Sequence, residues 1–356
     1  MVARLDRSTL LRSGVVGGLA AGAVSAADPA VGARGAGVVA HGIDVPWNIR
    51  FLPGYDTPTA LVSCRDSGNL LLVSHRSVRK VGHFDVVSRP VVAESGLLGL
   101  ALHPDFATNR LVYAFVSTRR DNRVVRFTFD GTTIGRSRPV LTGIGRAHHH
   151  NGGGLAFGPD GMLYVSTGEN EVKRLAQDKH SLNGKILRVT DTGATPSDNP
   201  FGNPVWSYGH RNPEGIAFDE QGRLWASEFG DHNYDEVNEI LRGHNYGWPR
   251  VEGSDGRGGF TDPIAQFRPN RCSPSGIAIA RGRAWIGALE GECLYSIVLE
   301  GPHAGRVRRF FHHGQGRTRA VSLAPDGTLW VGTSNRDGRA PLRRGDDHIF
   351  RVKLPG

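Results

Sequence analysis

The chain has 356 residues, enough for one large domain or two medium ones, and either would bury a sizeable core. Its 43 Lys and Arg outnumber its 34 Asp and Glu, which gives a formal net charge of +9. The basic residues are scattered singly among acids, with no block of five or six and no interleaving with aromatic side chains. This pattern argues against a nucleic-acid-binding protein and leaves open a positive site for a small anionic ligand.

The N-terminal segment has the order of a secretory signal peptide. Arg4, Arg7 and Arg12 come first, and a run of apolar and small residues then extends from Ser13 to Ala26. This run is too short to span a bilayer. We predict a signal peptide over residues 1–26, a flexible leader over 27–38, and export to the periplasm or the extracellular space without stable membrane insertion. A cytoplasmic N-terminal arm is the alternative.

After the leader, the chain repeats one phrase six times. Each copy pairs two short apolar strands across a turn, and most of these turns are rich in Pro, Asp and Gly, as tight hairpins favour. The copies are PWNIRFLPGYDTPTALVSC from Pro46, LLGLALHPDFATNRLVYAFVS from Leu97, GGGLAFGPDGMLYVSTGE from Gly152, PEGIAFDEQGRLWASEFG from Pro213, PSGIAIARGRAWIGALEG from Pro274 and TRAVSLAPDGTLWVGTSN from Thr318. They start about 44 to 61 residues apart, which is the length of one four-stranded propeller blade.

This spacing predicts an all-β protein: a six-bladed β-propeller of four-stranded antiparallel blades over residues 39–356. No long amphipathic helix is predicted. Residues 37–45 are expected to add a strand to the last blade and close the ring, which removes an open sheet edge. In such a ring the innermost strands line a central channel, so polar residues at the start of an inner strand are candidates for function.

The sequence contains only three cysteines, Cys64, Cys272 and Cys293. An odd and sparse set does not make a disulfide framework, even in an exported protein. We therefore predict that all three thiols are free. A bond between Cys272 and Cys293 is the alternative.

The first polar motif before an inner strand is RAHHHNGGG, residues 146–154. Adjacent residues on a strand point to opposite faces, so His148, His149 and His150 would rarely meet one metal ion. Glu169 lies at the end of the paired strand, and the hairpin brings it close to His150. A carboxylate on one imidazole nitrogen leaves the other as a proton acceptor, so we predict His150 as a general base oriented by Glu169. A metal site and a solvated loop remain alternatives.

Two arginine motifs precede later inner strands. SYGHRNPEG places Arg211 and Asn212 before the fourth repeat, where Arg211 offers a fork of donors to a carboxylate or carbonyl. GRTRAV places Arg317 and Arg319 two residues apart, and strand periodicity directs both guanidiniums to one face. Two cations facing one channel favour a polyanionic ligand. Pairing of Arg211 with a loop acid is the alternative.

The segment EFGDHNYDEVNEILRGHNYGWP, residues 228–249, is rich in oxygen ligands. It holds Asp231, Asp235, Glu236 and Tyr246 around glycine backbone. Carboxylate and carbonyl oxygens suit calcium, although the segment lacks the 12-residue helical calcium-loop pattern. A calcium site and an acidic surface loop are both compatible with this sequence.

Together these motifs resemble the soluble aldose (glucose-type) sugar dehydrogenases that depend on pyrroloquinoline quinone (PQQ). The resemblance rests on GLLGLALHPDF (96–106), HHNGGGLAFGPDGMLYVSTGE (149–169), SLNGKILRV (181–189), GHRNPEGIAF (209–218), SEFGDHNYDEVNEI (227–240), GHNYGWP (243–249) and GRTRAVSLAPDG (316–327). It implies an exported six-bladed propeller that holds PQQ with calcium over the channel mouth. The implied activity is oxidation of the anomeric hydroxyl of an aldose sugar to a lactone, with electrons passing to an acceptor.

The resemblance also implies roles for individual residues. His150 matches the catalytic base and Glu169 the acid that supports it, where the best-known members have Asp. The implied quinone contacts are Arg211, Asn212, Arg317, Arg319 and Glu94. The resemblance also implies that Arg211 polarises the quinone. Glu94 stands where a Gln is common in the family. The implied calcium ligands are Glu236 and Tyr246, with backbone oxygens of Gly230 and Asp231.

Two acids depart from the family pattern. Glu290, in ALEGECLY, stands where the family often places Lys or Arg, and with Glu94 it puts two negative charges near a trianion. Arg271 is a candidate for the compensating charge. Two other functions therefore stay open: a non-catalytic ligand-binding propeller that has lost the cofactor, and a metal-dependent lactonase, which needs several carboxylates around one channel ion.

Overall fold

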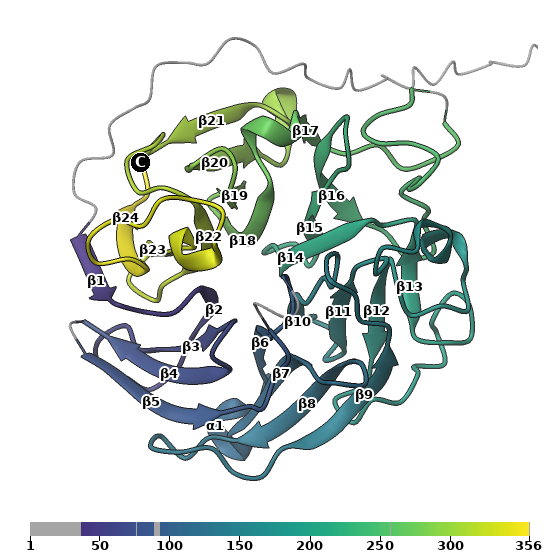
Figure 1. Cartoon of the computed structure of the whole chain (residues 1–356). Coiled ribbons are helices and arrows are strands. Elements are labelled where there is room, and N and C mark those ends of the chain that lie inside the picture. The colour runs from purple at the N-terminus through teal and green to yellow at the C-terminus, as the bar shows by residue number, and fades with distance from the viewer. Residues whose placement is uncertain (1–36, 76, 89–92, 257, 356) are drawn as a thin grey trace, which may run out of the picture.

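The computed structural model describes residues 37–355 apart from 76, 89–92 and 257, and it forms a ring of six four-stranded antiparallel sheets (Figure 1). The predicted six-bladed propeller is confirmed. From the inner strand outward, the blades are β2–β5 (Pro46–Phe51, Ala60–Cys64, Asn69–Ser74, Ser77–His83), β6–β9 (Leu97–Leu102, Leu111–Ser117, Asn122–Thr128, Arg138–Ile144), β10–β13 (Leu155–Phe157, Leu163–Thr167, Lys185–Val189, Val205–Tyr208), β14–β17 (Asn212–Phe218, Leu224–Phe229, Asp235–Ile240, Ala265–Phe267), β18–β21 (Pro274–Ala280, Arg283–Ala288, Cys293–Val298, Val307–Phe310) and β22–β24 with β1 (Thr318–Leu323, Thr328–Thr333, His348–Lys353, Gly37–His41). Every repeated phrase of the sequence forms the two inner strands of one blade.

The N-terminal strand closes the ring, as the sequence predicts. β1 pairs antiparallel with β24, with Val38 opposite Phe350, so the last blade combines both ends of the described chain. This pairing covers the edge that β24 would otherwise expose. The predicted signal peptide and residues 27–36 of the predicted leader lie outside the described residues, whereas residues 37 and 38 belong to β1.

The hydrophobic core lies between neighbouring blades. One cluster joins Leu61 of the first blade to Val112 of the second, and another joins Trp285 of the fifth blade to Leu329 of the sixth. Each remaining junction holds a comparable cluster within the described residues. A single sheet cannot bury both of its faces, so each blade depends on its two neighbours for stability.

Two kinds of glycine make this arrangement possible. Gly161 and Gly327, in the PDG turns between inner strands, have φ of +74° and +76°, which only glycine adopts without strain. Near the channel axis, a Cβ added to Gly99 would lie 2.1 Å from the carbonyl oxygen of Gly153. Glycine is therefore required where β6 passes close to the segment that leads into β10.

Helices are short in the described chain. They are the α-helix α1 (Phe106–Asn109) and the 3-10 helices η1 (Lys173–Gln177), η2 (Pro269–Arg271), η3 (Gly301–His303) and η4 (Asn335–Asp337). Within the described residues, none is long and apolar enough to cross a membrane. Cys64, Cys272 and Cys293 are all buried and free, which confirms the prediction of free thiols.

Candidate active site

One end of the ring carries a cavity of about 190 Å³. Its lining residues are Glu94, His150, Arg211, Asn212, Phe229, Ser273, Leu289, Glu290, Arg317 and Arg339. Many of them stand just before, or at the first residue of, an inner strand, and these strands all begin at the same end of the ring. The repeat therefore brings together side chains that are far apart in sequence. Most of the lining residues are polar, and Phe229 and Leu289 form an apolar part of the cavity wall.

Two hydrogen bonds hold His150 in place. Its Nδ1 is hydrogen-bonded to the carboxylate of Glu169, which is only 1% exposed, and its backbone N–H donates to Glu94 Oε2 at 2.9 Å. The φ of His150 is +58°, so this backbone lies in the left-handed region and relies on such contacts to stay there. Among the described residues, Nε2 has no hydrogen-bond partner, which leaves it as the ring nitrogen able to accept a proton.

The other two histidines of the run point elsewhere. His149 Nδ1 lies 2.9 Å from Glu171 Oε1, and His148 is exposed. Within the described chain, no set of three or more His, Cys, Asp and Glu side chains is arranged to hold a metal ion. The structure therefore gives no support to a three-histidine metal site and places only His150 against the cavity.

Arg211 lies at the cavity wall with one donor unused. Its Nη2 contacts Asp231 Oδ1 at 3.1 Å, and its guanidinium lies 5.5 Å from the centre of a Trp248 ring. Its Nε is buried and has no hydrogen-bond partner in the described structure. Neighbouring Asn212 is buried and accepts a hydrogen bond from the Gly152 N–H at 2.9 Å, so it shapes the loop that carries His150.

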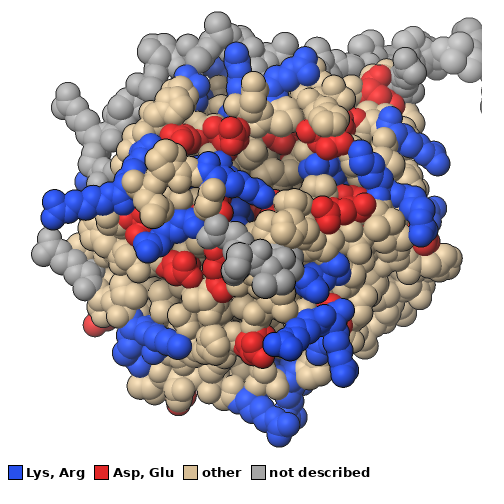
Figure 2. Space-filling model, in the orientation of Figure 1, with Lys and Arg blue, Asp and Glu red and all other residues tan. Residues whose placement is uncertain are grey.

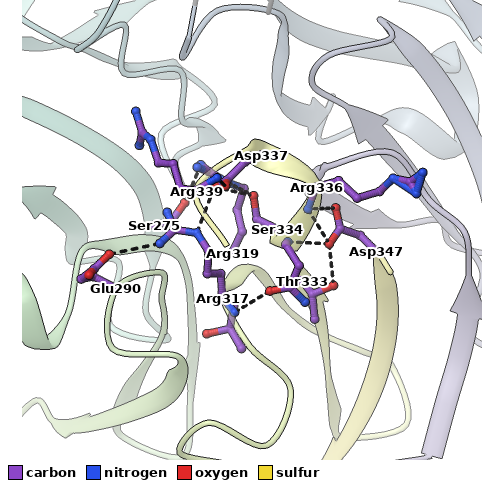
Figure 3. A network of polar contacts seen from close by, with 12 residues as sticks. Ser275, Glu290, Arg317, Arg319, Thr333, Ser334, Arg336, Asp337, Arg339 and Asp347 are labelled. Atoms are coloured by element: carbon purple, nitrogen blue, oxygen red, sulfur yellow. Dashed lines mark hydrogen bonds and ion pairs between the residues drawn. The ribbon is translucent and has the colours of Figure 1, made fainter. Parts of the chain in front are cut away.

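The two arginines of GRTRAV occupy different environments (Figure 3). Arg317 lines the cavity and contacts Asp337 Oδ2 at 3.1 Å and Glu290 Oε2 at 3.2 Å. Arg319 is not among the lining residues, since it is 1% exposed and its Nη1 donates to Glu214 Oε2 at 2.7 Å and to Ser275 Oγ at 3.0 Å. Arg317 is thus placed for a ligand, whereas Arg319 forms an ion pair within the channel.

Arg339 is a cavity residue that the sequence reasoning missed. It follows η4 in the last blade and its Nη2 contacts Glu94 Oε1 at 3.0 Å, across 245 residues of sequence. Burial by itself would raise the pKa of Glu94, but the Arg339 charge and the His150 N–H outweigh it and hold that pKa at about 2. Arg271, the expected compensating charge, is exposed and does not line the cavity.

A second, small cavity lies beside Arg211. It is lined by Gly209, Arg211, Glu228, Phe229, Gly230, Tyr234, Glu236, Tyr246, Trp248, Val251 and Glu252. Glu228 and Glu236 are directly opposite each other on β15 and β16 and both are buried, which is unfavourable for two like charges. Burial and, next, the charge of Glu228 raise the pKa of Glu236 to about 8.

The other expected calcium ligands are only partly brought together. Gly230 and Tyr246 line this small cavity, but the Tyr246 hydroxyl donates to the Glu239 carbonyl and accepts from the Leu241 N–H, so only its backbone oxygen could serve. The Asp231 carboxylate is paired with Arg211 and with Lys173 Nζ at 2.8 Å. Glu252 was not foreseen; its Oε2 accepts the N–H groups of Asp231, His232, Asn233 and Tyr234 and so fixes this loop.

The face of the ring drawn in Figures 1 and 2 carries charges of both signs. Figure 2 shows basic and acidic side chains interspersed over the face seen in Figure 1. The net charge of +9 is therefore not gathered there into one basic surface. This agrees with the scattered pattern in the sequence and gives no support to nucleic-acid binding.

Known proteins of related sequence and structure cover most of this chain. The structure of the PQQ-bound form of an aldose sugar dehydrogenase from Streptomyces coelicolor is 44% identical, covers 89% of this chain and 96% of that chain, and superposes with a TM-score of 0.84. Aldose sugar dehydrogenase YliI of Escherichia coli is 30% identical over 83% of this chain and 89% of its own length. Quinoprotein glucose dehydrogenase B of Acinetobacter calcoaceticus is 33% identical over 61% of this chain and 54% of its own length. Residues 43–344 match the family model described as Glucose / Sorbosone dehydrogenase, so the chain belongs to that family.

Proposed function

We propose that this protein is a quinoprotein oxidoreductase that oxidises the anomeric hydroxyl of aldose sugars to lactones, using PQQ and calcium. The observation that carries the proposal is His150, paired with buried Glu169, facing a cavity that Arg211, Arg317 and Arg339 also line. The similarity to an aldose sugar dehydrogenase solved with PQQ supports the same assignment. A sugar and an electron acceptor are the partners that this activity requires.

The residues present fit a polyanionic quinone. The buried Nε of Arg211 has no partner in the described structure and would meet an acceptor oxygen of the bound quinone. Three arginines line the cavity against two acids, Glu94 and Glu290. Arg317 and Arg339 are the cations placed to bind quinone carboxylates, and Arg319 keeps the contact with Glu214 described above.

The residues beside Arg211 fit calcium. Glu228 and Glu236 bring two buried carboxylates face to face, and a divalent cation between them would relieve their repulsion. Backbone oxygens of Gly230 and Tyr246 would complete a set of hard oxygen ligands of the kind calcium prefers. Calcium held there would sit beside Arg211, and both would withdraw charge from a quinone oxygen.

The chain's own residues would prepare the sugar for oxidation. His150 Nε2 would take the proton of the anomeric hydroxyl, and Glu169 would stabilise the imidazolium that forms. The bound quinone would supply the electron-accepting chemistry. Phe229 and Leu289 would exclude water from one wall of the cavity.

We also propose export, because the sequence begins with the pattern of a secretory signal peptide. This assignment is independent of the site. It is checked by N-terminal sequencing of protein recovered from outside the cytoplasm. A mature chain that starts near residue 27 is expected, and a chain that retains residues 1–26 would contradict it.

The activity is tested by reconstitution. The purified protein is incubated with PQQ and calcium, and dye-linked oxidation is measured over a panel of aldoses. Lactone formation that requires both PQQ and calcium is expected. Absence of PQQ binding at micromolar concentration would overturn the assignment and favour a propeller that binds another ligand.

A further inference from the structure

Arg317 is shared between two carboxylates that are held in different ways (Figure 3). Asp337 is buried and also accepts hydrogen bonds from Ser334 Oγ at 3.3 Å and from the Arg339 N–H at 2.9 Å. The Glu290 side chain is 56% exposed, and its carboxylate contacts Arg317. Asp337 is therefore a fixed part of the wall, whereas Glu290 contributes a carboxylate that water can reach.

The backbone under Glu290 is anchored although its side chain is not. The N–H groups of Glu290 and Gly291 both donate to the Cys272 carbonyl at 3.1 Å, and the Leu289 N–H donates to the Ser273 carbonyl at 3.0 Å. The carboxylate can therefore leave Arg317 by side-chain rotation alone, without moving the turn. Its departure leaves Arg317 neutralised by Asp337.

Glu94, the other acid of the cavity lining, differs on each of these points. Its side chain is 15% exposed, and its two oxygens are bound separately by Arg339 and by the His150 N–H. Moving it would release the backbone of the proposed base. Of the two acids that line the cavity, Glu290 is therefore the one that can be displaced.

We propose that Glu290 is a displaceable internal counter-ion, which occupies the anion-binding position on Arg317 and must be displaced when a ligand carboxylate binds there. This inference rests on the proposed function and adds an affinity-determining residue to it. Glu290 weakens binding twice, by competing for the guanidinium and by repelling an anionic ligand. It also favours ligands with a carboxylate able to displace it over neutral ligands of the same shape.

The test measures ligand binding directly in the purified protein. PQQ and, separately, citrate as a simple tricarboxylate are titrated by calorimetry into wild type, Glu290→Gln and Glu290→Lys. Glu300→Gln is the matched control, because the Glu300 side chain is 54% exposed and contacts Arg223 at 3.2 Å, so that its exposure and contact distance are close to those of Glu290, but it lies away from the cavity. Kd is expected to fall about tenfold in Glu290→Gln and further in Glu290→Lys, and to stay unchanged in Glu300→Gln.

The outcomes separate this inference from the proposed function. If PQQ binds wild type and Glu290→Gln equally, the counter-ion role is overturned while the quinoprotein assignment stands. If PQQ binds no variant, the quinoprotein assignment fails, and the citrate titration decides the counter-ion role. The counter-ion role is overturned if citrate binds wild type and Glu290→Gln equally, or binds neither. The role is supported if citrate binds Glu290→Gln more tightly than wild type.

Discussion

Replacing Arg319 by Met is expected to destabilise the ligand-free protein. Arg319 is 1% exposed and its guanidinium donates to Glu214 and Ser275. Met fills a similar volume but leaves Glu214, which is 4% exposed, without its cation. Breaking a buried ion pair in this way costs about 3–5 kcal/mol. With an unfolding entropy of about 2.1 cal/mol/K per residue over roughly 320 residues, 4 kcal/mol lowers Tm by about 6 °C.

The loss of stability in Arg319→Met is also expected to depend on pH. Burial raises the pKa of Glu214, and the charge of Arg319 opposes that rise. Without Arg319 the folded protein holds a proton on Glu214 to higher pH than the unfolded chain does, so the deficit in stability grows as pH rises from acidic to neutral.

The assay is thermal unfolding of ligand-free wild type and variants between pH 4 and pH 8. Arg351→Met, which breaks an exposed pair with Asp326 at 3.9 Å, is the control and should change stability by less than about 1 kcal/mol. The double variant Glu214→Gln with Arg319→Met should recover part of the loss. A stable Arg319→Met protein that has lost only ligand binding would refute this reasoning and make Arg319 a ligand contact.

Three further predictions follow from the site. His150→Ala should lower kcat by about 10²- to 10⁴-fold in dye-linked assays, whereas the Kd for PQQ should change less than about twofold. Undiminished turnover would show that His150 is not the general base. Glu94→Gln should cost about 1–3 kcal/mol at pH 7, and the difference should shrink as pH falls from about 4.5 through 2, because the folded pKa of Glu94 is held at about 2. Urea unfolding at each pH measures this difference, and a difference at pH 2 as large as that at pH 7 contradicts the ion-pair account. Glu236→Gln should lose the stabilisation by calcium, which is expected to be about 2.7 kcal/mol in wild type when calcium is present at 100 times its Kd. The measurement compares Tm in calcium with Tm in chelator for both proteins. Equal shifts of Tm in wild type and Glu236→Gln would place the ion elsewhere.

The fold was predictable because its pattern is local. Each inner hairpin is about twenty residues long, and its two strands are joined by a turn that in two blades needs a glycine with positive φ, at Gly161 and Gly327. Repetition of that hairpin at blade spacing then leaves few architectures that bury both faces of each sheet. The same locality makes the contact between His150 and Glu169 predictable, since both flank one hairpin.

Contacts between blades were not predictable in the same way. Arg339 and Glu94 meet across 245 residues, and Arg339 lies in an irregular segment that follows η4, where no strand periodicity indicates a direction. The separation of Arg317 from Arg319 was missed for a related reason. The pairing of β22 with β23 shifts register between Thr318 and Val321, so the simple alternation assumed for a regular strand does not hold there.

The charges of the cavity explain how one site can be built from arginines and still fold without a ligand. Arg211 is paired with Asp231, Arg339 with Glu94, and Arg317 with Asp337 and Glu290, so each guanidinium has a carboxylate before any ligand arrives. Three cations without these partners would destabilise the ring, because they would repel one another and the cost of desolvating buried Arg317 would be uncompensated. The free energy of ligand binding therefore depends on which of these carboxylates is displaced from its arginine. Exposure and anchoring single out Glu290, and the hydrogen bonds that fix Glu94 and Asp337 tie those two acids to the backbone of His150 and Arg339.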